Sequence, residues 1–333
     1  MPTSFLIIQT AFIGDVVLAT ALVEKLRQHH PDAEIDFLVR KGNETLLKGH
    51  PYLREIMIWD KKKGKLRNLF GLLRIIRSRR YHTVINVQRF FATGLLTAFS
   101  GAKERIGFDR NPLHFLFDRS IPHGGLTTKG HLHETDRNQR LIEHLTDAIP
   151  AKPRLYPSEA DRALVSAYQS EPYICVAPSS VWFTKQLPID TWAAFVKAAQ
   201  IKYKVFLIAG PSDHAVCEEV RELSGGSDRI TNLAGKLSLL QSVALQAVAV
   251  MNFVNDSGPL HFASATDAPV TAVFCSTVPA FGYGPLSAIS HTVEVEEVLT
   301  CRPCGIHGKK ECPKGHFDCG RKIRVEQLLQ HLP

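Results

Sequence analysis

The first residue of the sequence that could do chemistry is Asp15, in the turn QTAFIGDVV between an apolar run and a helical pattern. An aspartate at this place commonly caps the helix that follows it. Alternatively, it is a carboxylate at the rim of a cleft that accepts a proton from a substrate hydroxyl. The helix N-terminus would weaken it as a base, so this second role requires the proton to leave late. The residues alone leave both interpretations open.

A second set of candidates lies in VNDSGPLHFASA, residues 254–265. Ser257 and Gly258 form a turn before a helix whose first position suits Pro259, and the free N–H groups there can bind a phosphate. His261 adds a donor in the first turn, or it is an ordinary buried or surface histidine. Asp256 would repel phosphate, so we expect it to anchor the loop or to bond a sugar hydroxyl.

A third set lies in APSSVWFTKQLP, residues 177–188, which also follows an apolar run. Ser179, Ser180 and Thr184 offer hydroxyls and Lys185 offers a cation, although a single lysine in a loop usually faces solvent. The sequence has neither a G-x-G-x-x-G run nor a Walker lysine, so no nucleotide fingerprint is present. No acidic Asp-x-Asp motif lies near these loops, so a metal at the site is not required.

The elements that must position these loops alternate between short apolar runs and amphipathic stretches. This alternation favours the α/β class, with parallel sheets covered by helices on both faces. The expected strands are residues 4–10, 34–39, 55–59, 83–87, 173–178, 205–210, 251–256 and 270–274. The expected helices are residues 16–30, 66–79, 89–99, 190–200, 212–225, 237–249 and 258–267.

The length of 333 residues is enough for two domains. Prolines interrupt the pattern at residues 150–161, so we expect one doubly wound, Rossmann-like domain over 1–157 and a second over 158–333. Two such domains facing each other would bind a ligand in the crevice between the carboxyl ends of their strands.

The composition is that of an ordinary globular protein with a net charge of +8, which indicates an anionic partner. No apolar run is long enough for a membrane span. The N-terminal residues lack a basic leader and a cleavage site, so we expect a cytoplasmic protein whose seven cysteines are free thiols or metal ligands.

The segment from Asp256 to Pro285 resembles the signature of glycosyltransferase family 9, the heptosyltransferases. The matching residues are Asp256, Ser257, Gly258, His261, Pro269, Thr277, Pro279, Gly284 and Pro285. The Gly14-Asp15 turn is similar to the opening motif of the family, and Lys185 stands where the family has a lysine on the nucleotide diphosphate. The tail CRPCGIHGKKECPKGHFDC resembles a segment common in the second-heptose branch.

This resemblance implies the GT-B fold and an inverting transfer of heptose from ADP-heptose to a lipopolysaccharide inner-core acceptor. It implies that residues 1–157 bind the acceptor and residues 158–333 the donor. Asp15 would be the catalytic base. The donor would be bound by Ser179, Ser180, Lys185, Asp256, Ser257, Gly258 and His261. The sequence departs from the family at Cys275, where a Gly is common, and at Leu187, where many members have Trp. These departures put the exact donor sugar in doubt.

Two further segments could bind partners. Residues 60–82 are strongly basic, and a helix there would turn Leu69, Leu73 and Ile76 inward and its cations outward. That surface is either simply solvated or contacts a phosphorylated lipid acceptor and the anionic inner face of the membrane. A zinc site is suggested by the spacing of Cys301, Cys304, Cys312 and Cys319, although the second pair is more widely spaced than in most zinc sites. Free thiols or a redox-sensitive bridge are the alternatives.

Three other functions remain open. The chain could be a family-9 enzyme that uses another nucleotide sugar or a protein acceptor. It could also be an inactive scaffold with the same fold. Finally, it could be a basic nucleic-acid-binding protein with a zinc-binding tail, although no stacking motif or recognition helix supports this, and we expect no nucleic-acid partner.

Overall fold

The computed structural model describes residues 3–62, 64–124 and 132–333, and the chain forms two compact units. Unit 1 holds the described residues up to 124 together with Leu132–Tyr156. Unit 2 holds the described residues from Pro157 to Pro333. The chain therefore passes from one unit to the other between Tyr156 and Pro157, inside the proline-rich segment 150–161.

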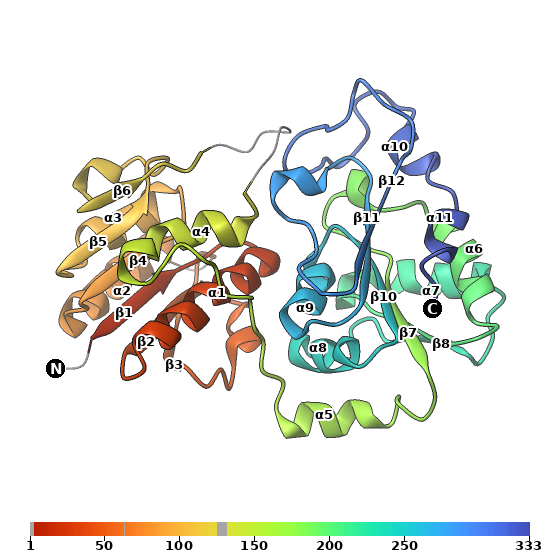
Figure 1. Cartoon of the computed structure of the whole chain (residues 1–333), viewed down its shortest axis with the longest axis horizontal. Helices are drawn as coiled ribbons and strands as arrows, with labels where there is room; N and C mark the ends of the chain where they lie inside the picture. Colours follow the sequence, from red (N-terminus) through yellow and green to blue (C-terminus); the bar gives the residue numbers. More distant parts are fainter. Residues whose placement is uncertain (1–2, 63, 125–131) are drawn as a thin grey trace. The chain divides into compact units, whose positions relative to one another are not determined.

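Unit 1 is built on a sheet of six parallel strands, drawn from red to yellow in Figure 1, in the order β3-β2-β1-β4-β5-β6. Its strands are β1 (Ser4–Ile8), β2 (Glu34–Arg40), β3 (Leu53–Trp59), β4 (Thr83–Asn86), β5 (Glu104–Phe108) and β6 (Arg119–Ile121). Its helices are α1 (Ile13–His29), α2 (Lys65–Arg79), α3 (Phe91–Ala98) and α4 (Glu134–Ile142).

Unit 2, drawn from green to blue in Figure 1, repeats the plan with six parallel strands in the order β12-β11-β10-β7-β8-β9. Its strands are β7 (Tyr173–Ala177), β8 (Lys204–Leu207), β9 (Ile230–Asn232), β10 (Met251–Asn255), β11 (Val270–Phe274) and β12 (Ser290–Glu294). Its helices are α5 (Glu159–Ser166), α6 (Ile189–Ala199), α7 (His214–Leu223), α8 (Leu239–Ala247), α9 (Gly258–Thr266), α10 (Asp318–Arg321) and α11 (Glu326–Leu329).

The strand order of each sheet reverses direction at its centre, between β1 and β4 in unit 1 and between β7 and β10 in unit 2. In doubly wound sheets, ligands bind beyond the carboxyl ends of the strands at this switch point. The three loops singled out in the sequence follow β1, β7 and β10. Each of them therefore lies at the switch point of its own sheet.

Alternate residues of β7 show why both faces of the unit 2 sheet must be covered. Ile174 and Val176 belong to one apolar cluster, and Tyr173, Cys175 and Ala177 belong to another. A strand buried on both faces reads as a continuous apolar run, which is how the sequence presents it. The predicted doubly wound α/β class is confirmed in both units.

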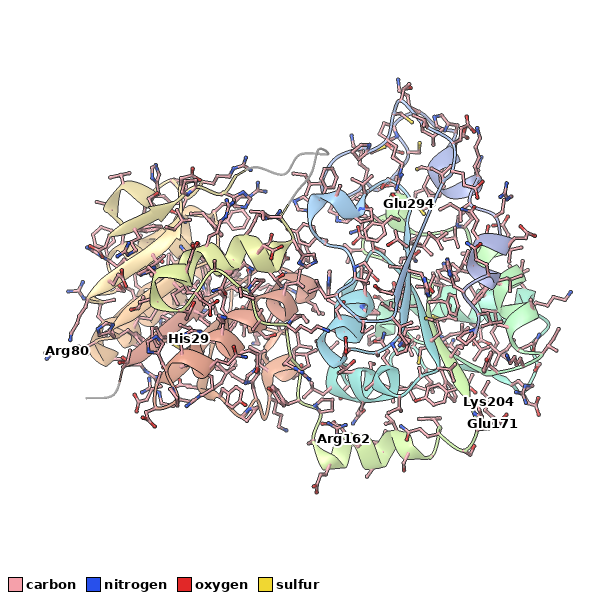
Figure 2. All side chains as sticks on the ribbon, in the orientation of Figure 1. His29, Arg80, Arg162, Glu171, Lys204 and Glu294 are labelled. Atoms are coloured by element: carbon pink, nitrogen blue, oxygen red, sulfur yellow. The ribbon has the colours of Figure 1, made fainter. Side chains whose placement is uncertain are left out.

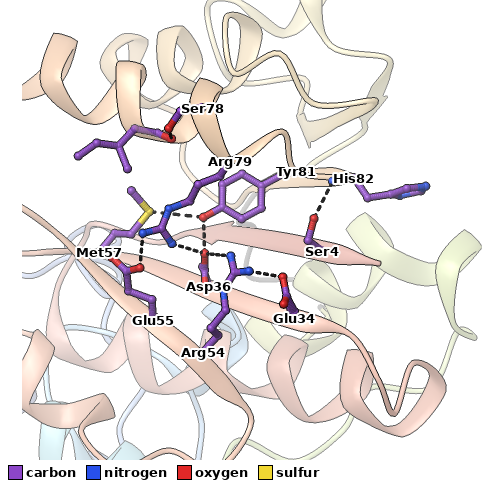
Figure 3. A network of polar contacts seen from close by, with 11 residues as sticks. Ser4, Glu34, Asp36, Arg54, Glu55, Met57, Ser78, Arg79, Tyr81 and His82 are labelled. Atoms are coloured by element: carbon purple, nitrogen blue, oxygen red, sulfur yellow. Dashed lines mark hydrogen bonds and ion pairs between the residues drawn. The ribbon is translucent and has the colours of Figure 1, made fainter. Parts of the chain in front are cut away.

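A buried polar network fastens α2 to the sheet of unit 1 (Figure 3). The Asp36 carboxylate in β2 is fully buried and accepts hydrogen bonds from Arg54 Nε at 2.9 Å and Arg79 Nη1 at 2.8 Å, and also from the Tyr81 hydroxyl. Burial alone would raise the pKa of Asp36, but the hydrogen bonds from Arg54, Tyr81 and Arg79 outweigh it and hold the pKa below its ordinary value. The network therefore joins β2, β3 and the end of α2 through an ionised carboxylate.

Several elements were not predicted from the sequence, and most of them are short or polar. The missed strands are β5, β6, β9 and β12, and the missed helices are α5, α10 and α11. Strands β6 and β9 have three residues each, too few to show an alternating pattern. Strand β12 reads SHTVE, and in it only Val293 is buried.

The basic segment forms α2 as predicted, with two differences in how its side chains face. Leu69 and Ile76 are buried as expected, but Leu72 takes the core position that was expected for Leu73, which is only half-buried. The expectation that Lys61 faces outward is wrong, because its ammonium lies 4.7 Å from the centre of the Trp59 ring.

The outward cations of α2 are placed as expected. Arg74, Arg77 and Arg80 are exposed, and Figure 2 shows Arg80 projecting from the edge of unit 1. Lys63 lies outside the described residues. Among the helices of the described part of the chain, none has the length and apolar character needed to span a bilayer.

Candidate active site

Asp15 occupies the third position of α1 and turns back to the residue that precedes the helix. Its Oδ2 accepts a hydrogen bond from the backbone N–H of Phe12 at 3.1 Å. This hydrogen bond confirms the expectation that Asp15 caps the start of the helix. Its side chain remains part of the surface at the carboxyl edge of the sheet, because residue 15 is only half-buried. A capping contact and a role in proton transfer are compatible, since a carboxylate has two oxygens and about four lone-pair sites.

The turn that carries Asp15 is held by side chains from three other loops. Lys61 Nζ donates to the carbonyl oxygen of Thr10 at 2.9 Å and to its hydroxyl at 3.0 Å. Asn43 Nδ2 donates to the Ala11 carbonyl at 3.0 Å. The Gln88 amide, just beyond β4, bonds to the Gln9 amide, just beyond β1. The start of α1 is thus fixed in place at the switch point of unit 1.

The central feature of the unit 2 switch point is an ion pair between two predicted residues. Lys185 Nζ lies 2.7 Å from Asp256 Oδ2, and the same oxygen accepts a hydrogen bond from the Thr277 hydroxyl at 2.7 Å. The side chains of Lys185 and Asp256 are 14% and 8% exposed. Single lysines in loops usually extend into solvent, but the side chain of Lys185 is largely buried. The expectation that Asp256 anchors its loop is confirmed.

Asn255 joins the two loops of this site and is not among the residues predicted from the sequence. Its amide Nδ2 donates to the Pro178 carbonyl at 2.8 Å, and its Oδ1 accepts from the Leu187 N–H at 3.1 Å. The signal was an amide at the end of a buried strand, where polar side chains usually serve the adjoining loops. Thr277 was noticed only as a motif position.

The serines after β7 shape the loop rather than meet Lys185 directly. The Ser179 hydroxyl donates to Asp213 Oδ2 at 3.1 Å. The Ser180 carbonyl accepts from the Gln186 amide at 2.6 Å, which folds the loop back beside Lys185. Both serines are half-buried. In this structure, Ser179 is therefore tied to the loop before α7, and Ser180 contributes its backbone.

The turn after β10 leads into α9 as predicted. Ser257 precedes the helix and Gly258 is its first residue, both half-buried, and the Ser257 hydroxyl donates to the Asn255 carbonyl at 3.3 Å. His261 is buried, and its ring lies edge-on to that of Tyr283 with the ring centres 6.4 Å apart. The half-buried start of a nine-residue helix beside a lysine is a favourable place for an anion.

The cysteines of the tail are free thiols in the structure. Burial raises the pKa of Cys319 to about 12, with smaller contributions from the neighbouring Cys304, Cys312 and Cys301. Over residues 3–62, 64–124 and 132–333, no three His, Cys, Asp or Glu side chains are gathered as a metal site would require. The zinc site considered for Cys301, Cys304, Cys312 and Cys319 is therefore not supported by the structure.

Comparison with known families identifies the class of protein to which the chain belongs. Residues 69–316, about three quarters of the chain, match the sequence profile of glycosyltransferase family 9 (heptosyltransferase). The chain belongs to glycosyltransferase family 9. The resemblance based on Asp256, Gly258 and His261 is confirmed, and the protein is a glycosyltransferase.

Individual relatives support the same family over nearly the whole chain. Lipopolysaccharide heptosyltransferase 3 of Escherichia coli K12 is 29% identical over 279 residues, which cover 79% of this chain and 80% of the relative. Lipopolysaccharide heptosyltransferase 2 of Salmonella typhimurium is 23% identical over 360 residues, covering 98% and 97% of the two chains.

Among solved structures, this family-9 chain is similar to the ADP-heptose lipopolysaccharide heptosyltransferase II of E. coli. The TM-score is 0.78 at 22% sequence identity, with 99% of this chain and 97% of that chain covered. At this identity the likeness shows the fold. The predicted GT-B class, with two parallel-sheet α/β units of six strands each, is confirmed.

Proposed function

We propose that this family-9 enzyme transfers heptose from ADP-heptose to an acceptor of the lipopolysaccharide inner core, with inversion at the anomeric carbon. The observation that carries the proposal is the Lys185–Asp256 pair beside the start of α9, at the switch point of a family-9 chain. The names of the relatives support the substrates, because those proteins are lipopolysaccharide heptosyltransferases and one is named for ADP-heptose.

In the proposed donor site, unit 2 holds the diphosphate of ADP-heptose. The Lys185 ammonium exchanges part of its contact with Asp256 for the phosphate oxygens, while Asp256 and Thr277 keep the lysine in place. Ser257, Gly258 and the start of α9 supply N–H and hydroxyl donors, and His261 supports this turn from within. Donors that are already oriented where charge develops commonly contribute the largest part of catalysis.

In the proposed reaction, the Asp15 carboxylate takes the proton of an acceptor hydroxyl. The hydroxyl oxygen attacks the anomeric carbon of the heptose, and a new glycosidic bond forms as the bond to the diphosphate oxygen breaks. The electron pair of that bond leaves with ADP, whose added charge meets Lys185 and the start of α9. A single displacement of this kind inverts the anomeric centre, and it needs no metal at the diphosphate.

The reaction is tested with ADP-heptose and truncated core acceptors, by following the product mass and its anomeric configuration. We expect a product one heptose heavier with inverted configuration. Transfer of a different sugar from its nucleotide, or onto a protein, would replace the proposed substrates with the other family-9 chemistry. Salt-sensitive RNA binding without nucleotide-sugar binding would favour the nucleic-acid function instead.

The base is tested with Asp15→Ala, measured beside Asp32→Ala, a change of an exposed aspartate beyond the other end of α1. We expect Asp15→Ala to abolish turnover and to leave ADP affinity largely intact, because the carboxylate acts on the acceptor. Asp32→Ala should turn over normally. Normal turnover by Asp15→Ala would remove Asp15 from this role.

We further propose that the protein acts at the inner face of the cytoplasmic membrane, using the outer side of α2. Leu66 and Phe70 are 67% and 58% exposed there, beside the exposed Arg67, Arg74 and Arg77. No acidic residue occurs in residues 61–80. Apolar side chains among cations favour a surface of anionic lipid.

This contact is tested by sedimentation with vesicles of phosphatidylcholine alone or with added phosphatidylglycerol. We expect binding only to the anionic vesicles, weakened by Phe70→Ser and by Arg74→Glu but not by Lys48→Glu, an exposed lysine of unit 1 that is not part of α2. Equal loss with Lys48→Glu would mean that net charge, not this face, drives binding.

A further inference from the structure

The segment after β12 that carries the first tail cysteines, residues 301–309, is here named the tail loop. Its second residue is Arg302, whose guanidinium lies over the end of β11. Arg302 Nε donates to the Cys275 carbonyl at 2.5 Å, and Nη2 donates to the Thr277 carbonyl at 2.7 Å and to the Phe274 carbonyl at 3.0 Å. The same group pairs with Glu294, labelled in Figure 2. The tail loop is therefore hydrogen-bonded to the segment whose Thr277 hydroxyl donates to Asp256.

The other end of the tail loop is bonded to the residue next to Lys185. The Thr184 N–H donates to the Lys309 carbonyl at 3.1 Å, and the Lys309 N–H donates to the Thr184 hydroxyl at 2.8 Å. The Thr184 carbonyl accepts from the Ser276 N–H at 3.1 Å, and the Ser276 hydroxyl bonds to that of Thr184 at 2.9 Å. Thr184 is 1% exposed, and its polar groups are thus used to join three segments.

Between these two attachments, Gly308 lies against the side chain of Lys185. The backbone φ of Gly308 is +74°, and a Cβ placed there would lie 2.8 Å from Lys185 Cγ and 3.1 Å from both Lys185 Cδ and Trp182 Cβ. Real Cβ atoms essentially never approach a neighbour as closely as the first of these distances. The backbone of the tail loop thus forms a wall along the aliphatic stem of Lys185, whose ammonium meets Asp256 at 2.7 Å.

We propose that the tail loop is a built part of the nucleotide-sugar site, in which Gly308 and the Thr184–Lys309 pair are positioning elements for Lys185. This inference rests on the proposed role of Lys185 at the diphosphate. A lysine has a flexible four-carbon stem, and holding it in one conformation costs rotamer entropy. Because the stem packs against Gly308, the lysine loses this conformational entropy when the protein folds. Less entropy is then lost when the donor binds.

The experiment compares Gly308→Ala with Gly315→Ala. The φ of Gly315 is +76°, and a Cβ there would have nothing within 4 Å. Both variants therefore carry the same backbone strain in the same tail, and only Gly308→Ala collides with Lys185. We measure the melting temperature, the Kd of ADP by calorimetry, and kcat and KM for ADP-heptose.

We expect the two variants to melt at similar temperatures. Gly308→Ala should weaken ADP about tenfold, the effect of releasing one restrained lysine, while Gly315→Ala stays close to the wild-type value. KM for ADP-heptose should rise in parallel with Kd. If Gly308→Ala binds ADP no more weakly than Gly315→Ala, the tail loop does not position the lysine and the proposal is overturned.

A double variant separates this inference from the function on which it rests. Lys185→Ala removes Cγ and Cδ, so Gly308→Ala in that background should weaken ADP no further. Equal weakening with and without the lysine side chain would show a general distortion of the loop and would overturn the positioning role. If Lys185→Ala alone leaves ADP affinity unchanged, the lysine is no donor ligand, and the proposed donor site fails together with this inference.

Discussion

Each unit of the protein buries an aspartate against cations, and the two aspartates are held very differently. Asp36 of unit 1 lies inside strand β2 and is fully buried, with two guanidinium groups and a phenol on its oxygens. Asp256 of unit 2 lies one residue beyond β10, and its side chain is 8% exposed. Its carboxylate is held by one ammonium and one hydroxyl.

The difference separates a carboxylate that holds structure from one suited to a binding site. A guanidinium offers a rigid fork that matches a carboxylate, whereas an ammonium is a compact charge on a flexible stem. Arg54 and Arg79 are committed to Asp36 and also to Glu34 and Glu55. Lys185 can share its charge with an incoming phosphate without leaving Asp256. Burial of an ion pair is therefore a poor guide to function unless the kind of cation and its place along the strand are considered.

The largest effect expected from this comparison is that of Lys185→Ala on catalysis. Loss of one charged contact to the departing diphosphate should raise the barrier by about 3–4 kcal/mol, or lower kcat/KM by about 10²–10³. The melting temperature should also fall, because the buried Asp256 carboxylate loses its ammonium partner, but the loss of kcat/KM should be the larger effect. Steady-state kinetics with ADP-heptose and a thermal melt measure both. A large fall in melting temperature with normal kcat/KM would place Lys185 in the same structural class as Arg54.

The next largest effect is expected from Asp36→Asn, which should lower the free energy of unfolding and leave the activity unchanged. Removing one partner of a buried ion pair is strongly destabilising, and we expect about 2–3 kcal/mol here because Arg54 and Arg79 keep some contact with water. Denaturant unfolding measures the loss, and the affinity for ADP should stay at its wild-type value. Weakened ADP binding without lost stability would contradict the structural role of Asp36.

A matched pair of hydroxyl deletions gives a smaller effect and sharpens the contrast. Tyr81→Phe removes a hydrogen bond to Asp36, and Thr277→Val removes one to Asp256; each bond is worth about 1 kcal/mol. Tyr81→Phe should lower the free energy of unfolding and leave KM for ADP-heptose unchanged. Thr277→Val should raise that KM several-fold. If the two variants changed the free energy of unfolding and the KM in the same way, the two carboxylates would not have different roles.

The smallest effect concerns acid stability. The pKa of Asp36 in the folded protein lies below the ordinary value of 3.8, so its contribution to stability is present above that value and is lost as the pH falls through the folded pKa. Melting temperatures measured from neutral pH down through 3.8 should fall less steeply for Asp36→Asn than for the wild type. If the melting temperatures of both proteins fell equally with pH, groups other than Asp36 would determine the loss of stability in acid.

Long apolar runs made the central strands and the fold class predictable from the sequence, because a strand buried on both faces leaves a continuous signal. The loops at the switch points were predictable for the same reason, since each directly follows such a run. Strands β6 and β9 were not, because three residues carry no period. In α2, Leu72 and Leu73 are adjacent leucines, so the apolar pattern alone did not decide which of them faces the core.

Contacts between distant segments were beyond the sequence. Lys185 and Asp256 are 71 positions apart, so neither residue alone predicts their ion pair at 2.7 Å. Gly308 shows no local pattern that points to Lys185. Asn255 reads as the end of a strand, and only the fold shows that its amide joins two loops. The sequence indicated the position of each loop, but not the contacts by which the loops support one another.

The position of Arg302 and Gly308 along the chain has a consequence for the order in which the protein matures. Both residues follow β12, the last strand of the unit 2 sheet. A nascent chain that has left the ribosome only as far as β12 can complete that sheet but lacks the backbone that steadies Lys185. With Lys185 in its proposed role, tight binding of a nucleotide is therefore acquired only after the strands of the unit 2 sheet have been synthesised.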